Sequence, residues 1–269
     1  MAEATRVQSR LLLQDSRILH AFSTRQGGVS AAPLATLNLG QSVGDDRDRV
    51  EENRRRFFGA LGIEPARVVR VYQVHGNKVL RVDDQLMRRP GFPHSLIDQR
   101  FGHDALISRL ANLALTVSTA DCVPILIHDP VRGAIAAVHA GWRGTACRAV
   151  AAAVAALREA YGTNPADCRA AIGPCIRACC FEVDAPVIEA MASAPVGWEA
   201  SATATRPEHW QLDLPGINRA LLIASGLLPD NIDDLGLCTS CRADLFFSHR
   251  RDKGRTGRMM NCILLRDET

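Results

Sequence analysis

Two neighbouring segments decide the fold: Thr119-Ala-Asp-Cys122-Val-Pro124 and Ala137-Val-His139-Ala-Gly-Trp142-Arg143-Gly144-Thr145. The apolar runs Leu113–Thr119, Ile125–His128 and Gly133–Val138 surround them and are typical of buried strands. Cys122 follows one strand and His139, 17 residues later, ends another. This spacing predicts adjacent strands that present both side chains at one end of a sheet.

The flanking chain mixes strands and helices without a strict βαβα order. Apolar positions between Val50 and Leu61 share one helical face, and a second helix is expected from Thr145 to a stop at Gly162. Further strands are expected at 18–22, 68–74, 105–107, 170–172, 245–248 and 261–265, with 79–82 as the hairpin partner of 68–74, and further helices after Asp184 and over 215–226. No internal repeat or linker appears. We therefore predict one α/β domain of the mixed-sheet α+β type over 1–269, with 84–103 as a variable surface loop.

Composition restricts the class of protein. The chain has 269 residues, 47% hydrophobic and 23% charged, with a net charge of +3. Its pI of about 8.4 is below the value of about 9 expected of a nucleic-acid-binding domain. No apolar run reaches the roughly 20 residues of a membrane span, and the N-terminus does not resemble a signal peptide. Nine cysteines, an odd number, suggest reduced thiols. We expect a cytoplasmic protein, monomeric or weakly dimeric, without nucleic-acid or membrane partners.

His75 also follows a predicted strand and precedes a glycine, which adds a third ligand-type side chain to Cys122 and His139. One cysteine and two histidines match a catalytic zinc site with an open fourth position, and copper accepts the same donors. The spacing leaves two alternatives open. Each residue could be structural, or Cys122 and a histidine could form a metal-free nucleophilic pair.

Two other sequence patterns indicate possible binding sites, less strongly than His75, Cys122 and His139 do. The turn Gly141–Gly144 leads into a predicted helix, so its amides and the Arg143 guanidinium could bind phosphate or carboxylate, although the spacing is not that of a P-loop. Cys238-Thr-Ser-Cys241 fits half of a structural zinc site. The candidates for the other half, Cys175, Cys179 and Cys180, are irregularly spaced, which favours buried thiols for all five.

Taken together, the motifs resemble the YfiH-like family, described as multicopper polyphenol oxidase or laccase-domain proteins. The resemblance covers nearly the whole chain. Besides the two opening segments, it is carried by 24–30, 38–40, 43–46, Asn53-Arg54, Gln73-Val-His75-Gly, Asp104-Ala-Leu-Ile107, Ile172-Gly-Pro174, Phe181-Glu-Val183, Cys238-Thr239, Phe247-Ser-His-Arg250-Arg and Thr256-Gly-Arg258. His249 departs from the family, because many relatives carry tyrosine there.

The resemblance implies a mixed α/β fold related to cysteine-dependent toxins and deamidases. It also implies that His75, Cys122 and His139 ligate a metal and serve catalysis, with zinc as the usual ion and copper as the alternative. Family members are described as purine nucleoside phosphorylases and, in some bacteria, as peptidoglycan editing factors.

A zinc-dependent purine nucleoside phosphorylase is therefore the leading hypothesis, acting on adenosine, inosine or methylthioadenosine plus phosphate, with linked adenosine deaminase activity. Arg143 is the candidate phosphate ligand, Arg54 and Arg250 could contact phosphate or ribose, and Asn38 could contact the base or sugar.

Two other activities are competing hypotheses. An amidase that removes misincorporated serine from UDP-MurNAc precursors is the alternative. A copper polyphenol oxidase is least favoured, because a trinuclear copper cluster uses several His-x-His pairs. The eight histidines, at 20, 75, 94, 103, 128, 139, 209 and 249, include no such pair.

Overall fold

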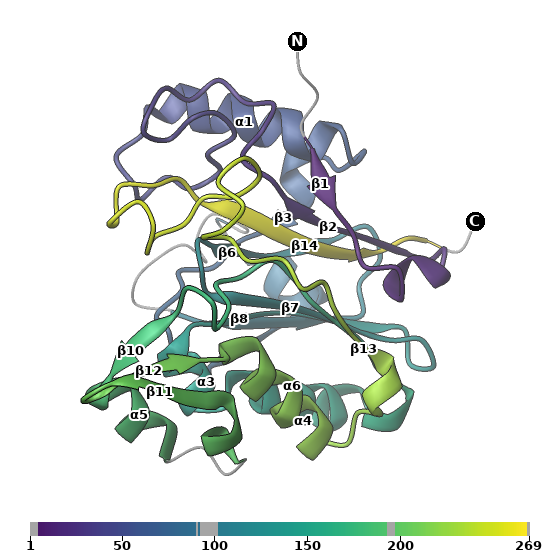
Figure 1. The fold of residues 1–269 in the computed structure, drawn as a ribbon. Coiled ribbons are helices and arrows are strands. Elements are labelled where there is room, and N and C mark those ends of the chain that lie inside the picture. The colour runs from purple at the N-terminus through teal and green to yellow at the C-terminus, as the bar shows by residue number, and fades with distance from the viewer. Residues whose placement is uncertain (1–4, 90, 92–101, 193–196, 268–269) are drawn as a thin grey trace.

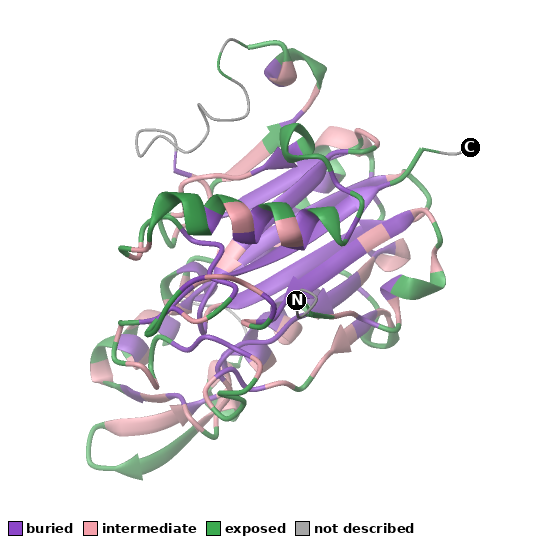
Figure 2. Cartoon of the chain, turned by 90° about the horizontal axis from the view of Figure 1, so that it is seen from above, coloured by how far each residue is buried: buried purple, intermediate pink, exposed green. Residues whose placement is uncertain are grey.

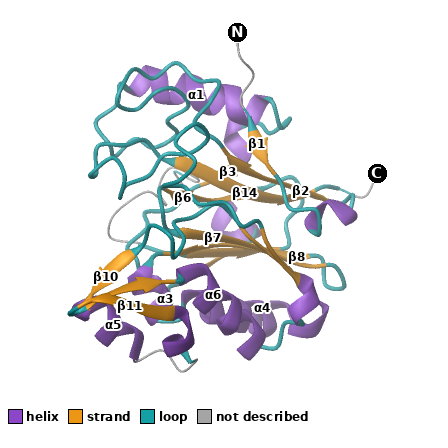
Figure 3. Cartoon of the chain, viewed as in Figure 1, coloured by secondary structure: helices purple, strands orange, loops and turns teal. Residues whose placement is uncertain are grey.

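Two mixed β-sheets lie face to face at the centre of the molecule, and helices cover the outer face of each (Figures 1 and 3). The computed structural model describes residues 5–89, 91, 102–192 and 197–267. The predicted mixed α/β class is confirmed, but the strands form two large sheets and a small third one.

The first sheet has five strands in the order β1-β2-β14-β6-β3, and the second has six in the order β13-β9-β7-β8-β5-β4. The first consists of β1 (Arg6–Val7), β2 (Ile18–Ser23), β14 (Met259–Leu265), β6 (Ala114–Thr119) and β3 (Val68–Val69). The second consists of β13 (Ile232–Asp234), β9 (Arg169–Ile172), β7 (Val123–Asp129), β8 (Ala134–Ala140), β5 (Ala105–Ser108) and β4 (Val79–Val82). The third, in the order β10-β12-β11, consists of β10 (Glu182–Asp184), β12 (His209–Leu212) and β11 (Ala202–Arg206).

The described helices are α1 (Arg47–Gly59), α2 (Asp84–Met87), α3 (Trp142–Ala146), α4 (Ala149–Tyr161), α5 (Ala185–Ala192) and α6 (Leu214–Ala224). The Asp46 carboxylate caps α1 by accepting from the amides of Asp48 and Arg49. The predicted helix end at Gly162 is confirmed: α4 ends there, and the φ of 67° at Gly162 is in the left-handed region that favours glycine.

Successive side chains along a strand point to opposite faces of the sheet, so they pack into two different apolar clusters, one between the sheets and one under α1. In β2, Phe22 faces the space between the sheets, whereas Ala21 faces α1. In β14, Ile263 likewise faces the space between the sheets, and Cys262 faces α1. Every residue of β7 and β8 is buried, because the other large sheet packs on one face and helices pack on the other. Figure 2 shows buried strands beneath a helix whose outer side is exposed. The strands that carry the candidate site are therefore fully enclosed.

The predicted hairpin between 68–74 and 79–82 is wrong. Strand β3 spans only Val68–Val69, and β4 pairs in parallel with β5. Beyond Val69, a side chain replaces the backbone pairing: the Gln73 amide accepts from the Ser118 nitrogen at 2.7 Å and donates to the Ser118 oxygen at 2.9 Å. A side-chain amide has the same donor and acceptor as a peptide unit, so the chain leaves the sheet without losing these bonds.

Three further predictions need correction. The helix expected from Thr145 begins three residues earlier as α3, and Arg148, at φ 61°, separates it from α4. Leu245 ends a turn and residues 246–248 are irregular instead of forming a strand, and the guanidinium of Arg251 satisfies the Phe246 carbonyl at 3.0 Å. The predicted loop at 84–103 begins with α2, while its residues 90 and 92–101 lie outside the described residues.

Among the described residues, no helix combines the length and the apolar character that crossing a membrane requires.

Candidate functional site

Cys122 and His139 meet at one end of the second sheet, but the strand that Cys122 follows, β6, belongs to the first sheet and is not the neighbour of β8. Cys122 directly precedes β7, and the antiparallel register of β7 with β8 sets Val123 opposite Ala140. His75 comes instead from the loop after β3, with φ 61°, and not from a strand end. Its ring lies edge-on to that of His139, with 4.9 Å between the centroids. One ligand atom from each of the three residues lies within 4.8 Å of the other two.

A single buried carboxylate, that of Asp104, holds both histidines. Its Oδ1 contacts His139 Nδ1 at 2.8 Å and accepts from the His75 amide at 2.9 Å. Its Oδ2 accepts from the amides of Gly76 at 2.7 Å and Val74 at 3.2 Å. Asp104 therefore orients the His139 imidazole directly and holds His75 through its backbone amide. A carboxylate at the second ring nitrogen, as at His139, is the usual arrangement behind metal-binding histidines.

The charges of Cys122 and His139 depend on each other. Burial alone would raise the pKa of the Cys122 thiol, but His139 and His75 lower it to about 6. Burial would likewise lower the pKa of His139, but the Cys122 thiolate and Asp104 raise it to about 9. The site therefore favours a thiolate, which is both the nucleophilic and the metal-binding form of cysteine.

Gly141 leaves space for this cluster. A Cβ atom at this position would lie 2.9 Å from the Cys122 sulfur and 3.1 Å from His75 Cδ2. Only a residue without a side chain fits between β8 and α3 at this point.

The donor set fits a soft or borderline metal ion. Two imidazole nitrogens and one thiolate are a three-ligand set for zinc, and copper accepts the same donors. His75, Cys122 and His139 also line one pocket of about 600 Å³ at the ends of the two large sheets. A fourth coordination position at these three residues could therefore face a substrate.

The pocket is strongly basic. In the part of the chain that the structure describes, its lining includes five arginines and one carboxylate, that of Asp121. Both oxygens of Asp121 are engaged, because they accept from the Thr239 hydroxyl at 2.6 Å and the Arg250 amide at 2.7 Å. Three aromatic side chains share the lining. The arginines are Arg54, Arg70, Arg143, Arg250 and Arg258, and the aromatic residues are Tyr72, Trp142 and Phe181.

Three of the four predicted substrate-binding residues line this pocket. Arg143 is exposed, and its guanidinium carbon lies 4.0 Å from the centroid of the Trp142 ring. Arg250 lies 5.1 Å from the Phe181 ring and donates to the Glu182 oxygen at 2.7 Å.

The third, Arg54, is buried. It donates to the Leu39 oxygen at 3.0 Å and to Glu51 at 2.7 Å. Burial, together with the charge of nearby Arg70, lowers the pKa of Arg54 to about 10. Two guanidinium groups that repel each other beside a pocket favour an anion there.

Asn38 is placed differently. It is fully buried, and it donates to Gly40 and Asp45 and accepts from the amides of Gly40 and Arg258. These bonds brace the loop before α1. Asn38 is not among the described residues that line the pocket.

Sequence reasoning assigned no role to Asp104, Arg70 or Arg258. A signal existed for Asp104, since a carboxylate directly before an apolar strand can reach the same sheet end as His139. Arg258 lies close enough to Cys122 and Asp121 for both charges to raise its pKa, although burial dominates and lowers it. The Arg258 guanidinium donates to the Thr256 and Gly257 oxygens close by in the chain. Its approach to Cys122 and Asp121, like that of Arg70 to Arg54, joins distant segments, so no local pattern indicates these two residues.

The chain resembles known proteins over nearly its full length. The family described as "Multi-copper polyphenol oxidoreductase laccase" matches residues 19–266. Purine nucleoside phosphorylase YlmD of Bacillus subtilis is 35% identical, with 96% of this chain and 95% of that protein covered. A purine nucleoside phosphorylase of Deinococcus radiodurans is 39% identical over 91% of this chain and 88% of that protein.

A solved structure shows the same fold. The crystal structure of the hypothetical protein YfiH from Bacillus licheniformis superposes with a TM-score of 0.87, at 37% identity over 93% of both chains. This chain therefore belongs to the multi-copper polyphenol oxidoreductase laccase family, which includes YfiH-type proteins and whose curated relatives are named purine nucleoside phosphorylases.

Proposed function

We propose that this protein is a metal-dependent purine nucleoside phosphorylase of the cytoplasm, with linked adenosine deaminase activity. Adenosine, inosine or methylthioadenosine reacts with phosphate: the bond from C1′ to the purine nitrogen breaks, a bond from C1′ to a phosphate oxygen forms, and free purine leaves. The names of the relatives support the reaction class.

One observation carries the proposal: among the described residues, five arginines and a single, fully engaged carboxylate line the pocket that holds His75, Cys122 and His139. Such a pocket attracts a phosphate dianion and stabilises the charge that phosphoryl oxygens keep during the reaction. The aromatic rings of Trp142 and Phe181 in the same lining offer faces on which a purine could stack.

His75, Cys122 and His139 would hold the metal ion, with Asp104 orienting both histidines. When bound, zinc or copper supplies Lewis-acid chemistry, polarising a substrate atom that carries negative charge in the transition state. Arg143 binds phosphate from the exposed side, and the buried Arg54 and its neighbour Arg70 contribute positive charge from the inner side.

Replacing Arg143 with alanine tests the phosphate site. We expect the KM for phosphate to rise about tenfold or more, as the loss of one charge-assisted bond of about 1.5–3 kcal/mol implies. The KM for nucleoside should change less, and the Arg158→Ala variant, on the exposed side of α4, should behave as wild type. An unchanged phosphate KM in folded Arg143→Ala would contradict the assignment.

Phosphate dependence also separates the competing reactions. Deamination of adenosine to inosine, hydrolysis of an amide and oxidation of a phenol do not consume phosphate. Release of serine from a muramyl-serine precursor, without nucleoside turnover, would favour the amidase instead.

A further inference from the structure

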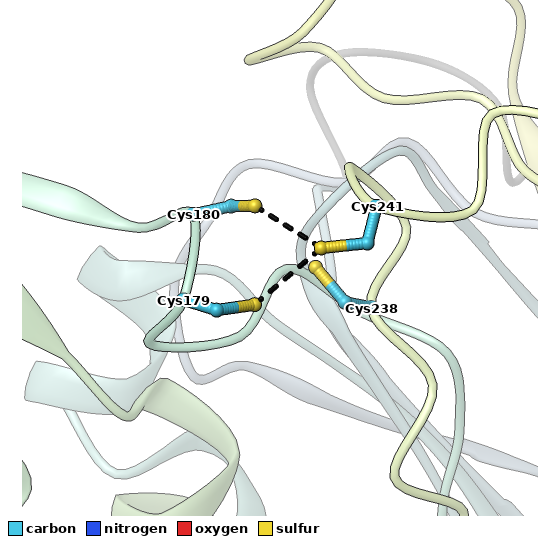
Figure 4. A group of neighbouring side chains, drawn as sticks. All are labelled: Cys179, Cys180, Cys238 and Cys241. Carbon is cyan, nitrogen blue, oxygen red and sulfur yellow. Dashed lines mark hydrogen bonds between the residues drawn. The ribbon is translucent and has the colours of Figure 1, made fainter.

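A second cluster of metal-binding side chains lies apart from the pocket. Cys179 and Cys180 come from the segment between β9 and β10, and Cys238 and Cys241 come from the segment after β13. Figure 4 shows the four sulfurs pointing toward one another from these two segments. All four sulfurs lie within 4.8 Å of one another. The prediction that these cysteines are buried thiols is wrong for Cys179 and Cys241, which are exposed, and for Cys180, which is half-buried.

The sulfur separations fit ligands of one ion. Cys241 Sγ lies 3.6 Å from Cys179 Sγ and 3.4 Å from Cys180 Sγ. A tetrahedral zinc ion with Zn–S bonds of about 2.3 Å places its sulfurs about 3.8 Å apart, whereas a disulfide requires about 2.05 Å. Small adjustments of side-chain torsions would therefore complete a tetrahedron, while a covalent bond needs much larger shifts.

The backbone holds the two segments in this register. The amide of Cys175 donates to the Leu237 oxygen at 3.2 Å, and the amide of Thr239 donates to the Cys175 oxygen at 3.0 Å. Backbone amides of Ser240, Cys241 and Arg177 point to the Cys238 sulfur. Amides directed at a sulfur stabilise a thiolate, as they do for other anions.

A cation supports the same segment. Arg251 donates from Nη1 to the oxygen of Thr239 at 2.8 Å and to that of Ser240 at 3.3 Å, both within the Cys238–Cys241 loop. The same guanidinium is paired with the Asp252 carboxylate at 2.8 and 2.9 Å, so Arg251 holds the carbonyls of the loop in place and does not bring an unpaired charge to it.

We propose that Cys179, Cys180, Cys238 and Cys241 form a structural site that binds one zinc ion through four thiolates. One Zn²⁺ replaces the protons of four thiols, and no electron transfer is involved. Four protein ligands leave no open position, which is typical of structural and not of catalytic zinc.

The site would clamp one wall of the pocket. Cys180 directly precedes Phe181, which lines the pocket, and Arg250 packs on the Phe181 ring while donating to Glu182 in β10. The loop with Cys238 and Cys241 also carries Thr239, the partner of Asp121 beside Cys122. Zinc would thus join the segment that carries Phe181 to the loop whose Thr239 holds Asp121, and both Phe181 and Asp121 line the pocket.

Metal content tests the proposal independently of enzyme activity. The reference is the variant His75→Ala/Cys122→Ala, which lacks two ligands of the pocket site. Purified under reducing conditions, it should retain about one zinc per chain by elemental analysis. Adding Cys238→Ser and Cys241→Ser should reduce zinc to near zero, whereas adding Cys147→Ser, an exposed thiol outside the cluster, should not.

Two further measurements test the site even if the variant that lacks Cys238 and Cys241 folds poorly. Cobalt added to the metal-free reference protein should give intense thiolate-to-cobalt charge-transfer absorption, which the single Cys180→Ser change weakens. A strong chelator should lower the thermal midpoint of the reference protein but not that of the folded Cys238→Ser/Cys241→Ser variant. A reference protein that holds no zinc and shows no cobalt band, or cysteines recovered as disulfides from reducing conditions, would overturn the site.

Discussion

At the scale of single residues, Asp104 and Gly141 determine whether the pocket cluster can form. Asp104 fixes one histidine by its ring and the other by its backbone amide. Gly141 keeps the volume next to the Cys122 sulfur free. Neither residue belongs to the three-residue cluster that could hold a metal ion, but both determine where the side chains of that cluster lie.

Replacing Asp104 with asparagine should weaken metal binding at the pocket about 10–100-fold, because changing the carboxylate partner of a ligand histidine typically costs that much. The control is Asp129→Asn, which alters another buried aspartate that accepts turn amides, from Val131 and Arg132. Competition with a chromophoric chelator measures both affinities. Equal losses in the two variants would show a general effect on folding.

Gly141→Ala should exclude the metal by steric conflict. The added methyl group would lie 2.9 Å from the Cys122 sulfur, and overpacking of this kind costs about 1–3 kcal/mol, so affinity should fall by about fivefold or more. Gly59→Ala is the matched control, because its new Cβ meets nothing within 4 Å. Metal content after dialysis compares them, and wild-type content in Gly141→Ala would contradict the packing argument.

At the scale of elements, strands β2 and β7 each carry a buried histidine that is neutral in the folded state. Burial lowers the pKa of both His20 and His128 to about 4. His20 Nε2 accepts from the Ser9 amide at 2.8 Å, which requires that nitrogen to be unprotonated. Within the described part of the chain, neither ring nitrogen of His128 has a hydrogen-bond partner.

Acidification should therefore destabilise the fold between about pH 6.5 and pH 4. In this window the unfolded chain binds protons at these histidines and the folded chain does not, so the free energy of unfolding falls as the pH falls. Each histidine should account for on the order of 2 kcal/mol by pH 5. Urea unfolding at pH 7.5 and pH 5 measures the loss. His128→Leu should reduce it, and an unaltered pH dependence would show that His128 is not the group responsible.

At the scale of the whole molecule, the pocket collects positive charge from elements that are distant in the chain. Arg54 comes from α1, Arg70 follows β3, Arg143 lies in α3, and Arg250 and Arg258 precede β14. Residues of α1, β3 and β14 pack into one apolar cluster, and α4, which follows α3, packs into another, so the packing of the fold holds the guanidiniums together against their repulsion.

Arg70→Gln should change the stability of the fold and the binding of phosphate in opposite directions. Removing the charge that opposes Arg54 should raise the melting temperature without phosphate by a few degrees at most. The further rise that phosphate produces by mass action should shrink. Arg67→Gln, an exposed change nearby, should alter neither value. Thermal unfolding with and without phosphate checks this, and a full phosphate shift in Arg70→Gln would remove Arg70 from the anion site.

Short-range patterns predicted the strands around Cys122 and His139, since burial on both faces makes them continuously apolar. They could not predict that Gln73 replaces backbone pairing, because that substitution depends on Ser118 in a distant strand. The Cys238-x-x-Cys241 spacing is visible locally, but its partners Cys179 and Cys180 belong to another segment. The role of Asp104 likewise becomes clear only when β5 lies beside β8.

The most direct test of the central claim is product analysis after incubating the purified protein with adenosine, with and without phosphate, alongside Cys122→Ala. We predict adenine and ribose 1-phosphate only when phosphate is present, with production lost in the variant while its fold, checked by circular dichroism, is kept. Absence of any phosphate-dependent product from the wild-type protein, or equal production by Cys122→Ala, would contradict a phosphorylase built on this cluster.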